Sequence, residues 1–146
     1  MKIRWLFVGA VFLAPGLLSA ETVYLQCEVE IVERERLADS IEGVLGDTSR
    51  FTVSLNESAG SVSHVYKSAS NVKDSREDGI FSPSDVTYSR AVRLSSANAV
   101  FQDFTIDRTD LSVRVVVTAG SRGFALPVYV QRGKCEILDV GRTRKF

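Results

Sequence analysis

The sequence contains few of the residues on which metal sites and catalytic sites usually depend. It has one histidine, His64, and two cysteines, Cys27 and Cys135. A single histidine excludes a histidine-rich zinc site, and a Ser-His-Asp triad would have to use His64. Moreover, no Gly-x-Ser-x-Gly motif is present. We therefore expect a protein that is not an enzyme, with no catalytic residue, no metal ion and no cofactor.

Long apolar runs are absent after the first twenty residues. Lys2 and Arg4 precede an uncharged apolar run from Trp5 to Leu18, and a small residue, Ala20, closes the segment. This arrangement is typical of a secretory signal peptide, and its apolar run is too short to span a bilayer. The sequence predicts a signal peptide over residues 1–20 and one domain over residues 21–146, periplasmic or secreted and without stable membrane insertion.

The two cysteines lie near opposite ends of the expected mature domain. Neither belongs to a Cys-x-x-Cys motif, and no histidines cluster with them. An exported chain meets an oxidising compartment, in which such a pair normally closes. We therefore predict one structural disulfide between Cys27 and Cys135, which would tie the two ends of the domain together.

Charge differs strongly between the two halves of the mature chain. Residues 21–86 hold 6 basic and 13 acidic side chains, and residues 87–146 hold 10 and 5. The mature balance is slightly acidic and lacks tryptophan, so nucleic acid is not an expected partner. Two interpretations of the asymmetry remain open. Either the basic half faces an anionic partner, or the halves interleave as neighbouring strands and their charges largely cancel.

Under the first interpretation the partner is an envelope or extracellular protein or an anionic surface polymer. The candidate partner-binding residues are the basic side chains of the C-terminal half: Arg114, Arg122, Arg132, Lys134, Arg142, Arg144 and Lys145. Arg114 lies on the parity opposite to that of Val113 and Val115, so we expect its guanidinium to be exposed.

Alternation of apolar and polar residues with a period of two dominates the mature chain. Turn-forming residues separate the runs, which predicts an all-β antiparallel meander of seven or eight strands, as a small barrel or a sandwich. The alternating runs are Val23–Ile31, Phe51–Leu55, Ser61–Tyr66, Val86–Leu94, Val100–Ile106, Leu111–Val117 and Phe124–Leu138.

Three segments depart from this alternation. Glu33–Leu45 has apolar residues at helical spacing, which predicts one short amphipathic helix. Ser68–Ser84 is polar and charged, which predicts a long mobile loop. In the last run the apolar parity changes near Gly133, so we expect a bulge or tight turn there that returns Cys135 to the core.

Three polar side chains interrupt otherwise apolar faces of predicted strands: Arg90, Gln102 and His64. In a closed sheet such side chains can converge on a ligand, and an inward arginine can bind a carboxylate or phosphate as a fork. Alternatively, each lies at a strand end where its polar group reaches water, or pairs with an acid such as Asp103.

Two acidic groups are candidates for a calcium ion or for backbone capping. Asp107 and Asp110 flank a predicted turn, and Asp74, Glu77 and Asp78 crowd one segment. Neither group has the spacing of a calcium loop, and acidic turn residues more often cap backbone amides. We therefore expect no metal at either place.

Short motifs give the chain a resemblance to a group of exported proteins. The N-terminal Cys27, the segment Phe104-Thr105-Ile106-Asp107-Arg108 and the closing Gly133-Lys134-Cys135 resemble small secreted proteobacterial β-proteins of unknown function. The resemblance implies a β fold and export, and it implies no activity.

Two functions follow from these observations. The first is a non-enzymatic exported interaction protein of the cell envelope, such as an inhibitor, immunity or accessory factor. The alternative is a small-ligand carrier with an interior pocket at Arg90, Gln102 and His64. A continuous cavity lined by these three residues would favour the carrier, and a filled core with an exposed patch would favour the interaction protein.

Overall fold

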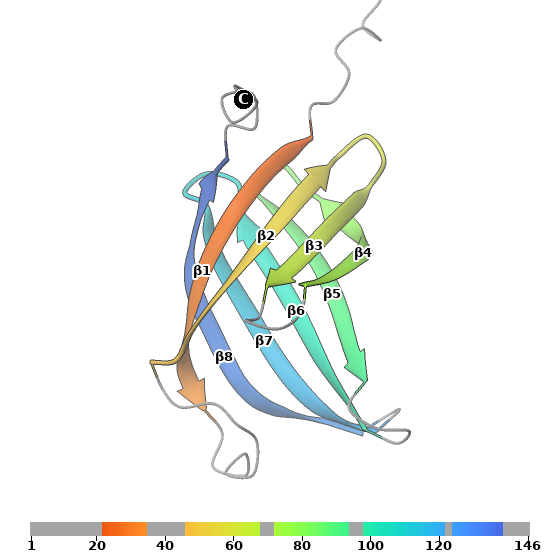
Figure 1. Ribbon diagram of the computed structural model, residues 1–146, viewed down its shortest axis with the longest axis vertical. Helices are drawn as coiled ribbons and strands as arrows, with labels where there is room; N and C mark the ends of the chain where they lie inside the picture. Colours follow the sequence, from red (N-terminus) through yellow and green to blue (C-terminus); the bar gives the residue numbers. More distant parts are fainter. Residues whose placement is uncertain (1–21, 35–45, 68–71, 94–97, 122–123, 139–146) are drawn as a thin grey trace, which may run out of the picture.

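The computed structural model is a closed barrel of eight antiparallel strands (Figure 1). It describes residues 22–34, 46–67, 72–93, 98–121 and 124–138. Within these ranges no helix is long and apolar enough to cross a membrane. The strands are β1 Val23–Arg34, β2 Thr48–Asn56, β3 Ser61–Lys67, β4 Val72–Phe81, β5 Asp85–Arg93, β6 Ala99–Asp107, β7 Ser112–Ser121 and β8 Phe124–Ile137.

Each strand pairs with the next along the chain, and β8 returns to pair with β1. The all-β meander is thereby confirmed, and it takes the form of a barrel. Period-two alternation explains the closure, since one parity of every strand must face the lumen. In β1 that parity carries Leu25, Cys27, Val29 and Ile31, all of them buried. The hairpin of β2 with β3 and the meander of β5, β6 and β7 also follow the predicted runs.

A disulfide between Cys27 and Cys135 lies at the seam where the barrel closes. The two cysteines are direct register partners on β1 and β8, with Cα atoms 4.0 Å apart, although 108 positions separate them in the sequence. Both side chains are buried in the core. The predicted disulfide is thus present, and it is consistent with an oxidising compartment.

Gly133 lies beside the disulfide and faces the lumen in regular pairing with Val29 on one side and Val113 on the other. The bulge predicted there was therefore wrong. The irregularity in β8 lies earlier, where the register with β7 shifts between Val117 and Thr118, and Pro127 pairs with Thr118. A proline cannot donate to the ladder, which favours such an irregularity. The shift places Cys135 in the core, as predicted.

The predicted loop over Ser68–Ser84 was also wrong, because most of it forms β4. Its lumen-facing positions opposite Val62 and His64 carry the polar residues Glu77 and Ser75, and the next such position is Gly79. No apolar alternation therefore marked the strand. Of the predicted helix, Glu33–Arg34 end β1 instead, and residues 35–45 lie outside the described residues.

Opposite charges from the two halves of the chain are neighbours on the outer surface. β1 from the acidic half pairs with β8 from the basic half, and this register places Glu28 opposite Lys134 and Glu30 opposite Arg132. Arg50 on β2 forms an ion pair with Glu28, and Arg132 lies 3.7 Å from a Glu33 carboxylate oxygen. At this surface the halves interleave, which is the second of the two interpretations of the charge asymmetry.

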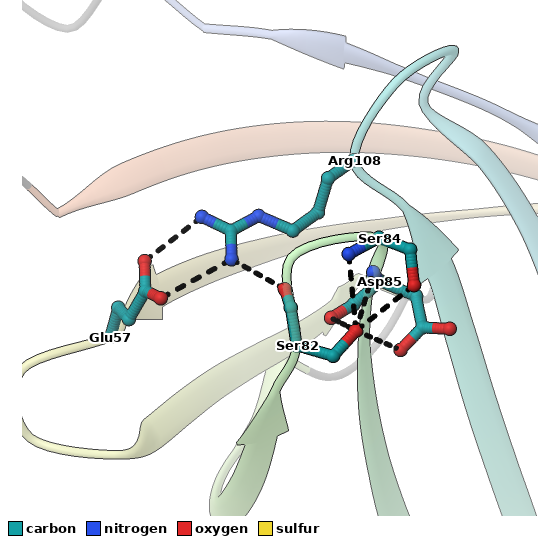
Figure 2. A network of polar contacts seen from close by, with 5 residues as sticks. All are labelled: Glu57, Ser82, Ser84, Asp85 and Arg108. Carbon is teal, nitrogen blue, oxygen red and sulfur yellow. Dashed lines mark hydrogen bonds and ion pairs between the residues drawn. The ribbon is translucent and has the colours of Figure 1, made fainter.

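Polar contacts join three turns at one end of the barrel (Figure 2). Arg108, after β6, donates two hydrogen bonds to the Glu57 carboxylate, at 3.2 and 2.9 Å, and one to the Ser82 carbonyl oxygen at 2.7 Å. Glu57 lies in the β2–β3 turn and Ser82 in the β4–β5 turn. We call these three residues the latch. A cavity of about 320 Å³ lies behind it, lined mainly by aliphatic side chains.

A substitution at Gly133 tests the close approach of β1 and β8. A Cβ at this position would overlap the Glu28 carbonyl oxygen and lie 2.8 Å from the Val29 Cα atom. Because the obstacle is backbone, we expect Gly133→Ala to lower the free energy of unfolding by about 1 to 3 kcal/mol, measured by urea denaturation.

Gly79→Ala is the matched control, since Gly79 also faces the lumen from a strand. A Cβ there would meet side-chain atoms, Val62 Cγ2 at 2.8 Å and Phe81 Cε2 at 2.9 Å, which can shift. We expect the smaller loss for this variant. An equal or larger loss for Gly79→Ala would contradict the assignment of Gly133 to the barrel closure.

Candidate functional site

A cavity of about 370 Å³ occupies the end of the lumen opposite the latch, and all three predicted ligand-binding residues line it. Arg90 comes from β5, Gln102 from β6 and His64 from β3, and each lies on the lumen-facing parity of its strand. The complete lining is Ser49, Phe51, His64, Tyr66, Arg90, Val92, Gln102, Phe104, Tyr129 and Gln131.

Arg90 is partly buried, and its charge has no acidic partner among the described residues. Its Nε donates to Ser75 Oγ at 2.9 Å, and its Nη1 donates to Gln102 Oε1 at 3.2 Å. Both acceptors are neutral, so they orient the guanidinium without cancelling its charge. A partly buried cation of this kind is costly to the fold and favours an anion.

The barrel wall beside Arg90 is incomplete. β4 and β5 pair at only three positions, Gly79–Phe81 with Val86–Tyr88. Beyond Tyr88 the two strands are not paired, and the Arg90 side chain crosses between them to reach Ser75. The guanidinium is therefore held by two strands, β4 through Ser75 and β6 through Gln102.

His64 is fully buried and forms a 2.8 Å hydrogen bond with Tyr88 through its Nδ1 atom. Burial, reinforced by the charge of Arg90, lowers the pKa of His64 from 6.5 to about 3. Burial also raises the pKa of Tyr88 well above 10. Both groups are neutral at ordinary pH, so one ring nitrogen of His64 carries a proton and the other is an acceptor. The tautomer decides whether Tyr88 or His64 donates in this hydrogen bond.

Aromatic rings form the rest of the wall. Phe51 stacks on His64 with centroids 4.7 Å apart, and Phe104 stacks on Tyr88 with centroids 4.5 Å apart. An edge contact of 5.4 Å between Phe51 and Phe104 joins the two stacks. Each ring contacts the next, so these side chains form a continuous apolar surface.

Two tyrosines and a buried amide complete the site. Burial, with a smaller effect of neighbouring Tyr66, raises the pKa of Tyr129. Gln131 is buried and donates to Ser49 Oγ at 3.2 Å. The sequence did not mark Tyr66, Tyr129, Ser49 or Gln131 as site residues. Phe51 could have been identified as facing the lumen, since it lies on the core parity of its strand. Tyr129 and Gln131 could not, because the apolar parity changes within β8.

The predicted partner-binding residues lie elsewhere. Arg114, Arg132 and Lys134 are exposed on the outer surface of β7 and β8. Arg114 and Arg132 are register partners, while Lys134 lies 4.0 Å from an Asp110 carboxylate oxygen. The other four lie outside the residues whose side chains are described: Arg122, Arg142, Arg144 and Lys145.

The acidic groups do not converge on a metal site. Asp107 Oδ1 accepts backbone hydrogen bonds from Thr109 and Asp110, and Asp110 Oδ1 accepts one from Ser112. These contacts are the capping role expected of acidic turn residues. In β4 the outward Asp74 and Asp78 are exposed, while Glu77 lies on the opposite parity. Across the described part of the chain no group of metal-ligating side chains is assembled.

The neutral state of His64 makes stability depend on pH in a specific window. The unfolded chain binds a proton at His64 below about pH 6.5, whereas the folded chain does so only near pH 3. Stability is therefore complete above pH 6.5 and falls as the pH decreases toward 3. Between about pH 7.5 and pH 5 we expect a loss of about 2 kcal/mol in the free energy of unfolding, measured with urea.

His64→Gln is the control, because no other histidine titrates in this window. Its stability should change much less between the same two pH values. If the variant does not fold, ¹⁵N NMR of wild-type His64 gives the answer directly. An imidazole that is protonated at about pH 5 in the folded protein would contradict the prediction.

Comparisons with known proteins add no function. No protein-family model matches the chain, and no curated protein or solved structure is significantly similar to it. A functional interpretation therefore depends on the geometry of the cavity.

Proposed function

We propose that this protein is a carrier that binds a small anionic molecule inside the barrel, without covalent chemistry. The observation that carries the proposal is Arg90, a partly buried guanidinium that has only neutral partners, Ser75 and Gln102, among the described residues. An anion in the cavity would supply the missing counter-charge.

The cavity has the size and composition of a small-molecule site. Its volume of about 370 Å³ lies in the range of such sites, which are mostly apolar with a few placed polar groups. Here those groups include Arg90, Gln102 and His64.

The same observation favours the carrier over an envelope interaction protein. A cavity shared by Arg90, Gln102 and His64 is the feature that we expected to favour the carrier. Binding through the outer basic residues stays a prediction, and the nearby Glu28, Glu30 and Asp110 reduce the field that a partner would meet. We further propose that the carrier works in the periplasm or outside the cell, which the disulfide supports.

Anilinonaphthalene sulfonate is a suitable probe, because it is an anion whose fluorescence rises in an apolar site and residues 21–146 contain no tryptophan. We expect saturable binding to the disulfide-bonded protein. Arg90→Gln should weaken binding about tenfold or more, since it removes the charge that assists the hydrogen bonds.

Arg93→Gln is the matched control, because Arg93 lies on the same strand but is exposed outside the lumen. It should bind the probe like the wild type. Equal weakening by both substitutions would place the probe on the surface, and lack of saturable binding to the wild type would overturn the carrier function.

A further inference from the structure

The two ends of the lumen differ in the kind of apolar side chain that lines them. The cavity that contains Arg90 is lined by several rings, and Val92 is the aliphatic side chain among its described lining residues. The cavity behind the latch is instead lined mainly by aliphatic groups such as Leu25 and Ile106. A molecule bound near Arg90 therefore meets the faces and edges of rings.

Rings line the ligand cavity on both sides of the lumen: Phe104 lies on β6 with Gln102, and its ring contacts Phe51 on β2 at 5.4 Å. Phe51 on β2 and Tyr66 on β3 are register partners, as are Arg90 on β5 and Gln102 on β6. In a closed order of eight strands β2 lies across the lumen from β6. An acidic group held by Arg90 thus leaves the remainder of its molecule among the rings that line the cavity.

The depth of the site is limited by the filled centre of the barrel. Val53, Val62 and Val115 are fully buried between the two cavities. The stacked pair of Tyr88 and Phe104 lies beside the ligand cavity and is also buried. The described residues therefore leave no continuous channel for a long acyl chain, whereas a compact planar molecule fits the cavity near Arg90.

We infer that the ligand is a compact aromatic acid, an inference that rests on the proposed carrier function. Arg90 binds the acidic group as a charge-assisted donor, with the amide of Gln102 beside it. The ring of the ligand lies among the lining rings Phe51, Phe104 and Tyr129, where offset and edge contacts are favourable. Aliphatic acids of the same size lose these ring contacts.

Four ligands separate the parts of this inference when their binding to the disulfide-bonded protein is measured by calorimetry. They are naphthoate, its saturated counterpart decalin carboxylate, the neutral naphthalenemethanol, and palmitate. Naphthoate should bind about tenfold more tightly than either decalin carboxylate or naphthalenemethanol. Palmitate should bind more weakly than naphthoate.

Tyr129→Leu tests the aromatic contact within the protein. It should weaken naphthoate binding several-fold and leave decalin carboxylate unchanged, because an aliphatic group replaces a ring. Tyr24→Leu is the control, since Tyr24 is 39% exposed and does not line the cavity.

The outcomes distinguish the inference from the function on which it rests. Decalin carboxylate or palmitate binding as tightly as naphthoate would overturn the aromatic selectivity and leave an anion carrier. If neither naphthoate nor decalin carboxylate binds, both the selectivity and the carrier function fail.

Discussion

Closure of β8 on β1 is the constraint on which the rest of the barrel depends. Without it the sheet would have two free edges, and the lumen would open to water along its length. Two features hold β1 and β8 together at the seam where the barrel closes. The disulfide joins Cys27 to Cys135 across the pair, and Gly133 allows the two backbones to approach closely. In the chain-entropy account, a crosslink over about a hundred residues stabilises the fold by about 4 to 5 kcal/mol.

Side chains fill the centre of the closed barrel, whereas one end of its lumen contains a cavity. Fully buried valines pack its centre, and the latch of Glu57, Ser82 and Arg108 closes one end. The latch is partly exposed and such surface pairs contribute about 0 to 1 kcal/mol, so the core and the seam supply most of the stability. The other end carries polar groups and rings around a cavity. The partly buried Arg90 therefore lies at the cavity end of the lumen and not in the packed centre.

Sequence alone predicted the strands whose lumen side is apolar, because burial on one face imposes a period of two. It also predicted the disulfide and the convergence of Arg90, Gln102 and His64. It missed β4, since that strand faces the polar part of the lumen with residues such as Ser75 and therefore lacks an apolar face. It misplaced the irregularity in β8, because glycine at position 133 indicated a bulge where the structure instead needs a close backbone approach.

β4, which the sequence pattern did not predict, also shapes the surroundings of Arg90. Continuing the register of Gly79 with Tyr88 would place Glu77 opposite Arg90, both on the lumen face. The strands separate before that position, and Arg90 extends to Ser75 instead. The separation of β4 from β5 thus removes the regular pairing that would have placed the Glu77 carboxylate opposite Arg90. If the protein binds an anion as we propose, the charge of Arg90 contributes to the binding energy, and the weak pairing of β4 with β5 then links the stability of the barrel to that affinity.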